Sequence, residues 1–173
     1  VRPGFVRAPL DDGEASGPPP AEALKIYMAK GEKIYSKCLG CHGADGKGGP
    51  QYPSLVGSEW VVGDTERFAM IILNGLVGPT STGKSYGAAG MAPQGVGMSP
   101  TDLASVMTYV RNSFGNTTGD VVTVGMAAEA IAISEARTTS GQMTAETLAA
   151  SHAKMLPGEP LDPATMLDPI SLE

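Results

Sequence analysis

Two cysteines and a histidine constrain this chain more than any other feature, because they stand within five residues of one another. Cys38 and Cys41 are separated by two residues, and His42 follows the second cysteine directly. This C-x-x-C-H pattern is the attachment signature of c-type haem. On a helical turn the two thiols can reach the two vinyl groups of one porphyrin, and the imidazole can reach the iron from the same face. The sequence therefore predicts one covalently bound haem c, with His42 as an iron ligand.

Other sites built from cysteine and histidine are less compatible with the sequence. A structural zinc site takes four such ligands, and the residues around Cys38 cannot supply them locally. A thioredoxin-like redox pair follows a strand in a βαβ unit, and no such pattern precedes the motif. The second histidine, His152, lies near the end of a predicted helix. There we expect it on the surface, where it would interact favourably with the helix dipole.

Composition indicates one small acidic domain with additions. A chain of 173 residues can form one compact core with tails, and a porphyrin would add the bulk that an aromatic content of only 5% does not supply. The formal net charge of -6 argues against nucleic acid as a partner. No apolar run approaches the length that spans a bilayer. No basic-then-apolar leader follows Val1, so we expect a processed chain, and covalent haem of this type implies export to the periplasm or an equivalent space.

Proline and glycine divide the chain into three parts. Residues 1–20 are rich in proline and predict an extended N-terminal segment. Residues 21–118 hold the haem motif and the strongest helical patterns, and they predict the haem domain. Residues 119–173 predict a C-terminal extension that is helical at first and irregular after Pro157. The proline-rich ends, residues 1–20 and 157–173, are most simply disordered, or they dock a partner, and we expect little of their apolar surface to join the core.

Helix signals indicate an all-α chain. Asp64 predicts one N-cap, and Ser99 predicts a second with a capping box closed by Asp102. Gly31 is a predicted weak point in the first helix. Apolar residues at helical spacing predict helices from residue 21 to the haem motif and over residues 65–74, 100–114, 126–137 and 144–155.

The second axial ligand of the iron has to come from another part of the chain. Haem c with histidine on one side commonly takes a methionine thioether on the other, which raises the reduction potential. Most of the nine methionines are core fillers by their helical positions or lie in later segments. Met91 lies in a glycine-rich loop whose backbone can approach a flat cofactor, so we favour it as the ligand. Met98 is the main alternative, although it is also placed to pack on Leu103 as a hydrophobic staple.

Several of these segments resemble a class I monohaem cytochrome c. The likeness begins in the stretch 31–43, which contains the haem motif, and continues in Gly90-Met91-Ala92-Pro93 and the helix after Ser99. It spans roughly residues 29–116 and implies the small cytochrome c fold, in which short helices wrap around one covalently bound haem. Residues 21–118 would then be the cytochrome c domain. The family often has proline directly after the methionine, whereas here Ala92 intervenes.

The resemblance also implies roles for individual residues. The stretch 52–57 is similar to a family loop in which a proline carbonyl receives the other ring N–H of the ligand histidine. Carried over to this chain, that role falls on Pro53, and Leu55 would line the haem. The family also packs its first helix across its last one through a glycine and aromatic rings. The residues that fit this crossing are Gly31, Tyr35 and Tyr109.

A narrower likeness suggests the kind of partner. Residues 58–76 and 109–116 resemble bacterial cytochrome domains found with membrane-bound dehydrogenases and respiratory assemblies. This implies one-electron transfer with redox protein partners, as a subunit or docked partner of a membrane-bound complex, rather than substrate catalysis. Trp60 would donate its indole N–H to a haem propionate, or it is ordinary packing. Two alternatives remain: a haem enzyme or gas sensor with an open iron site, and a mainly architectural subunit of a larger complex.

Overall fold

The computed structural model describes residues 22–162 and 165–172, and over this range the chain is all-α as predicted. Backbone pairing of the strand type is limited, in the described residues, to three isolated bridges. The predicted extended segment 1–20 lies outside the described residues. No helix in the described part is long and apolar enough to cross a membrane. The helices are α1 Glu22–Tyr35, α2 Leu39–His42, α3 Glu59–Val62, α4 Thr65–Asn74, α5 Pro100–Arg111, α6 Val124–Glu135 and α7 Ala145–Ser151.

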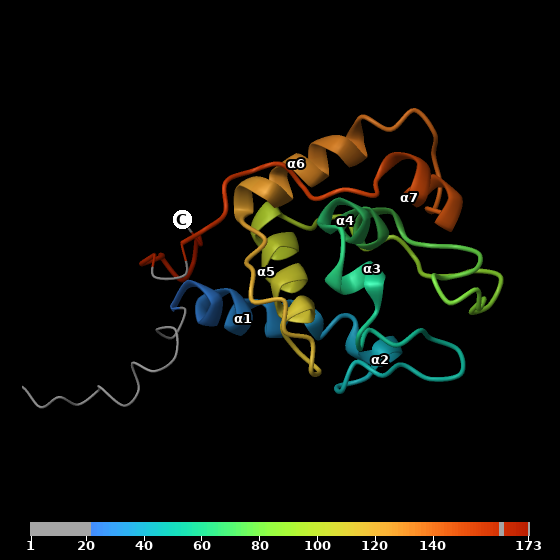
Figure 1. Ribbon diagram of the computed structural model, residues 1–173, viewed down its shortest axis with the longest axis horizontal. Coiled ribbons are helices and arrows are strands. Elements are labelled where there is room, and N and C mark those ends of the chain that lie inside the picture. The colour runs from blue at the N-terminus through green and yellow to red at the C-terminus, as the bar shows by residue number, and fades with distance from the viewer. Residues whose placement is uncertain (1–21, 163–164, 173) are drawn as a thin grey trace, which may run out of the picture.

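Helices α1 and α5 cross in close contact (Figure 1). At the crossing, a Cβ atom on Gly31 would overlap the carbonyl oxygen of Ser105 and the side chain of Tyr109. The rings of Tyr35 and Tyr109 pack beside it, with centroids 5.4 Å apart. Helix α1 runs unbroken through Gly31, so the predicted weak point is a packing position. The crossing implied by the family resemblance is present.

Helix α4 forms one side of the core and has the predicted bounds. It ends at Gly75, whose φ of 77° is accessible to glycine at little cost. Asp64 occupies the N-cap position, but its side chain makes no cap hydrogen bond. Instead Asp64 Oδ2 lies 3.7 Å from Arg67 Nη2. The helix boundary was therefore predicted correctly, while the expected capping interaction is replaced by an ion pair.

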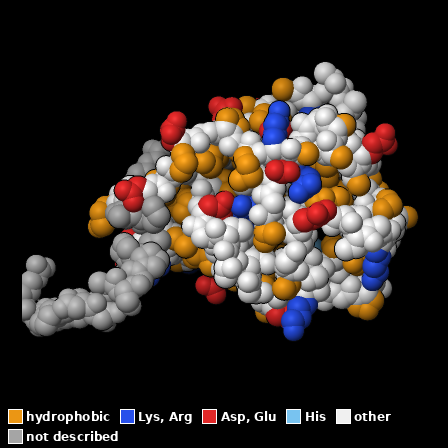
Figure 2. Space-filling view, viewed as in Figure 1, with side chains coloured by type: hydrophobic (Ala, Val, Ile, Leu, Met, Phe, Trp, Pro, Cys, Tyr) orange, Lys and Arg blue, Asp and Glu red, His pale blue; other side chains and the backbone are white. Residues whose placement is uncertain are grey.

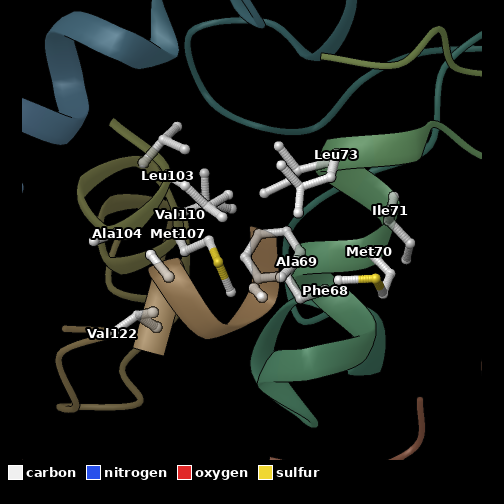
Figure 3. Packing of buried hydrophobic residues seen from close by; sticks show 14 of the residues in the cluster. Phe68, Ala69, Met70, Ile71, Leu73, Leu103, Ala104, Met107, Val110 and Val122 are labelled. Atoms are coloured by element: carbon white, nitrogen blue, oxygen red, sulfur yellow. The ribbon is translucent and has the colours of Figure 1, made fainter. Parts of the chain in front are cut away.

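Helix α5 faces α4 across the core, and Figure 3 shows Met107 and Val110 of α5 directed toward Phe68 and Leu73 of α4. The predicted capping box is present, because Ser99 Oγ accepts from the Asp102 N–H and Asp102 accepts from the Ser99 N–H. The helix ends at Arg111, earlier than predicted. Asn112 donates to the Thr108 carbonyl at 2.9 Å and satisfies one of the last helical acceptors. Phe114 therefore lies outside the helix, with a φ of 59°.

The C-terminal extension, residues 119–173, covers the helical core over its described part. Helix α6 packs on α4 and α5, and the chain then passes through α7 and back toward α1 (Figure 1). Leu156 and Leu172 are buried, and Lys30 Nζ donates to the Ile170 carbonyl at 3.1 Å. The described tail thus contributes apolar side chains to the core. This differs from the expectation of little contact, because leucines spaced along an irregular chain can each reach the core separately.

His152 is buried rather than exposed at a helix end, so the expectation of a surface histidine is wrong. It is 7% exposed, and its Nδ1 lies 2.8 Å from Oε1 of the buried Glu66 on α4. The reason is tertiary: α7 ends at Ser151, directly before this residue, and the following segment turns inward against the start of α4. On the face shown in Figure 2, basic and acidic side chains are interspersed and form no single-sign patch.

Candidate haem site

The two cysteines lie on one helical turn. The backbone N–H groups of Cys41 and His42 donate to the Cys38 carbonyl at 3.2 and 2.9 Å. Both thiols are free rather than joined in a disulfide, with Cys38 partly buried and Cys41 exposed. Burial, with a smaller contribution from nearby Cys41, raises the pKa of Cys38. The turn therefore presents two free thiols immediately before the histidine.

His42 is held in one orientation by a backbone carbonyl. Its Nδ1 lies 2.9 Å from the Pro53 oxygen, so Nδ1–H donates and Nε2 keeps its lone pair. A hydrogen bond of this kind is typical of a metal-ligating histidine. Burial lowers the pKa of His42, which favours the neutral imidazole that a metal needs. The structure thus brings together the histidine and the proline that the family resemblance pairs.

The loop that carries Pro53 is fixed by hydrogen bonds to distant residues. Asn116 Nδ2 donates to the Leu55 and Val110 carbonyls, both at 3.0 Å. Asn116 Oδ1 accepts from the Gly57 N–H at 2.7 Å. Asn116 is 5% exposed and was missed by sequence reasoning, whose only signal was its place at the end of the family-like stretch 109–116. It positions the loop that in turn orients His42.

The aromatic ring of Tyr35 connects the same site to α1. Its hydroxyl donates to the Gly43 carbonyl at 2.7 Å, one residue after the motif. Burial, with smaller contributions from Cys38 and other neighbours, raises the pKa of Tyr35 to about 12. The hydroxyl therefore stays protonated and remains a donor at neutral pH. The Gly31 crossing and the haem motif are consequently joined through one side chain.

Leu55 and Trp60 occupy different environments. Leu55 is half-buried and packs against the edge of the core. Trp60 lies in α3 with 9% exposure, among the core side chains. Its burial in the core agrees with a packing role for Trp60. Its predicted hydrogen bond to a propionate stays a prediction.

Met91 is half-buried at the edge of the core, in the long loop between α4 and α5. Its N–H donates to the Leu76 carbonyl at 2.7 Å, and its carbonyl accepts from the Leu76 N–H at 3.0 Å. Gly90, with a φ of 61°, permits this pairing, because a Cβ atom there would overlap the Leu76 oxygen. Met98 is also half-buried, and its N–H donates to the Gly95 carbonyl at 3.1 Å. The choice of Met91 over Met98 as ligand stays a prediction.

The family model for cytochrome c matches residues 28–114, which is half of the chain. The chain belongs to the cytochrome c family. The family carries covalent haem c, and the free thiols of Cys38 and Cys41 with the available Nε2 of His42 fit that group.

Two characterised relatives are similar to this cytochrome over about half its length. The cbb3-type cytochrome c oxidase subunit CcoP of Rubrivivax gelatinosus is 33% identical over 97 residues, which cover 53% of this chain and 28% of that protein. Cytochrome c-552 of Thermus thermophilus is 28% identical over 99 residues, which cover 54% of this chain and 66% of that protein. The chain thus spans less than two thirds of the length of either relative.

Proposed function

We propose that this chain transfers one electron at a time between redox proteins, with His42 and Met91 as the axial ligands of its haem iron. The observation that carries the proposal is the 2.9 Å contact between His42 Nδ1 and the Pro53 oxygen. It leaves Nε2 as the ligand atom and gives the imidazole a fixed direction. When bound, haem supplies reversible exchange between ferrous and ferric iron, and a methionine thioether favours the ferrous state.

The protein's part in this function is to hold both ligands with little freedom to move. Asn116 fixes the loop of Pro53, and Leu76 pairs with the backbone of Met91. Ligands held in this way keep the structural change between the two oxidation states small. Two occupied axial positions would also exclude oxygen and peroxide, so no substrate chemistry is required.

The proposed division of the chain follows the same reasoning. Residues 1–20 would be an N-terminal segment, 21–118 the cytochrome c domain and 119–173 an extension. The match of the family model to residues 28–114 supports the middle part.

We infer that the chain works as a subunit or docked partner of a respiratory or dehydrogenase complex, in the periplasm or an equivalent space. Support comes from the narrower likeness of residues 58–76 and 109–116 and from the similarity to an oxidase subunit, CcoP of Rubrivivax gelatinosus. Purification from native membranes at low ionic strength tests this inference. Co-elution with identified respiratory or dehydrogenase subunits is expected, while recovery only as a free monomer would contradict it.

The electron-transfer proposal is tested on the holoprotein. One haem per chain and a redox titration that follows a single one-electron curve are expected. His42→Ala should lose the low-spin spectrum, while His152→Gln, which changes the other histidine, should retain it. Rapid binding of carbon monoxide by the ferrous wild-type protein at neutral pH would instead support an open iron site.

A further inference from the structure

The C-terminal extension contacts the Met91 loop through one side chain. Gln142 Nε2 lies 2.8 Å from the Ala89 carbonyl oxygen and 2.7 Å from the Met91 carbonyl oxygen. A side-chain amide carries two N–H donors, so Gln142 can satisfy both carbonyls at once. With the Leu76 N–H as its second donor, the Met91 carbonyl accepts two hydrogen bonds. The backbone of Met91 is therefore restrained from two directions.

Gln142 is itself held in place by the residue that follows it. Met143 is fully buried, its N–H donates to the Gly75 carbonyl at 3.0 Å, and its carbonyl accepts from the Val77 N–H at 2.9 Å. Leu76 thus lies between Met91 on one side and Met143 on the other, bridged to both. The amide of Gln142 is consequently presented from a fixed backbone rather than from a free loop.

The loop that leads to Met91 has little packing of its own. Residues 81–85 and 87–90 are exposed, and Gly87 and Gly90 adopt positive φ values. Exposed segments with few buried contacts open locally at low free-energy cost. On the far side of Met91 the loop is tied to α4, because the Gln94 and Gly95 N–H groups donate to the Ile72 and Leu73 carbonyls. At Met91 itself, the hydrogen bonds made by Leu76 and Gln142 restrain the backbone, in addition to the packing of its side chain against the core.

We propose that Gln142 is a positioning residue for the Met91 ligand. It acts through the Ala89 and Met91 carbonyls to keep the thioether directed at the iron. The proposal rests on the assignment of Met91 as ligand. Gln142 lies outside residues 28–114, where the family model matches, so the restraint is supplied by this chain's extension.

The test uses the holoprotein and the replacement Gln142→Met, which keeps the length of the side chain and removes the donors. Gln94→Met is the matched control, because Gln94 Nε2 donates only to the Ala92 carbonyl, two residues away in the same loop. The readout is the midpoint pH at which, as the pH is raised, methionine is released from the ferric iron and the sulfur-to-iron charge-transfer band disappears. Loss of two hydrogen bonds favours release by about tenfold, which lowers this midpoint by about one pH unit in Gln142→Met. Gln94→Met should match the wild-type protein.

The outcomes separate the positioning role from the ligand assignment. A purely structural role for Gln142 would lower the melting temperature and leave the midpoint pH unchanged, which would overturn the proposal. Gln142→Ala repeats the measurement should the methionine variant fail to fold, and the same shift is expected. If Met91→Ala abolishes the band while neither Gln142 variant moves its midpoint, the positioning role alone is wrong. If the band survives Met91→Ala, the ligand assignment fails and the positioning role with it.

Discussion

Arg111 and Asp120 form a two-pronged ion pair at the end of α5. Arg111 Nη2 lies 2.7 Å from Asp120 Oδ2, and Nε lies 3.2 Å from Oδ1. The remaining Arg111 nitrogen, Nη1, donates to the Val61 and Gly63 carbonyls, both at 2.8 Å. The side chain of Arg111 is 3% exposed. One buried guanidinium therefore joins α5 to the end of α3 and to the start of the extension.

This pair predicts a stability that depends on pH. Burial of Asp120 opposes its ionisation, but hydrogen bonds from Arg111 and Thr118 and the Arg111 charge outweigh burial and lower the pKa of Asp120. A carboxyl whose pKa is lowered by folding stabilises the fold at pH values above its ordinary pKa, which is 3.8 for aspartate. This contribution is lost as the pH falls through the folded-state pKa.

Asp120→Asn should consequently lower the free energy of unfolding at pH 7, and the difference from wild type should shrink below about pH 4. Urea unfolding at pH 7 and pH 3 measures this. The exposed Glu129 on α6 provides the control, and Glu129→Gln should have little effect at either pH. A difference between Asp120→Asn and wild type that stays constant across this range would contradict the account.

The contact between Glu66 and His152 predicts a second effect on stability. Two further hydrogen bonds join the extension to the first turn of α4. The Glu66 N–H donates to the Lys154 carbonyl, and the Leu156 N–H donates to Thr65 Oγ1 at 2.7 Å. His152→Ala leaves Glu66 Oε1 without its partner, beside an Oε2 that already makes no hydrogen bond. We expect a loss of about 2 kcal/mol in the free energy of unfolding.

Thermal or denaturant unfolding of the holoprotein checks this value. Lys154→Ala is the control, because Lys154 Nζ is exposed and 3.9 Å from Glu66 Oε2, and its loss should cost less than about 1 kcal/mol. Equal losses of stability in the two variants would show that the buried hydrogen bond between His152 and Glu66 stabilises the fold no more than the exposed contact of Lys154.

Two glycines in helices predict opposite results for the same substitution. Gly31→Ala places a methyl group against the Ser105 carbonyl and Tyr109, so the α1–α5 crossing must open and stability should fall by about 3 kcal/mol. Gly125 is an exposed position near the start of α6, and a Cβ atom there would have only Thr123 Oγ1 nearby, at 3.8 Å. Gly125→Ala should raise stability by about 0.5 kcal/mol through helix propensity. Melting temperatures of both variants give the comparison, and a neutral Gly31→Ala would show that the crossing is less tight than described.

Features that depend on neighbours in sequence were predicted well. The turn of Cys38 to His42, the bounds of α4 and the capping box of Ser99 are each determined within a few residues. Local signals of this kind need no knowledge of the fold. The all-α architecture follows from the same helical patterns.

Features that depend on distant contacts were predicted poorly. Asn116 donates to the carbonyl of Leu55, and Arg111 donates to the carbonyl of Val61. No local sequence pattern predicts either partner, because both lie about fifty or more residues away in the chain. His152 was assigned to the surface because its burial depends on where the extension returns to α4. The end of α5 was placed too late for a similar reason, since the side chain of Asn112 closes the helix before Phe114.

The ferric charge-transfer band between sulfur and iron reports directly whether a methionine thioether binds the haem iron. We expect the wild-type holoprotein to show this weak red band, Met91→Ala to abolish it and Met98→Leu to retain it, with one haem per chain in all three proteins. A band that persists in Met91→Ala and disappears in Met98→Leu would contradict the account and assign the ligand to Met98.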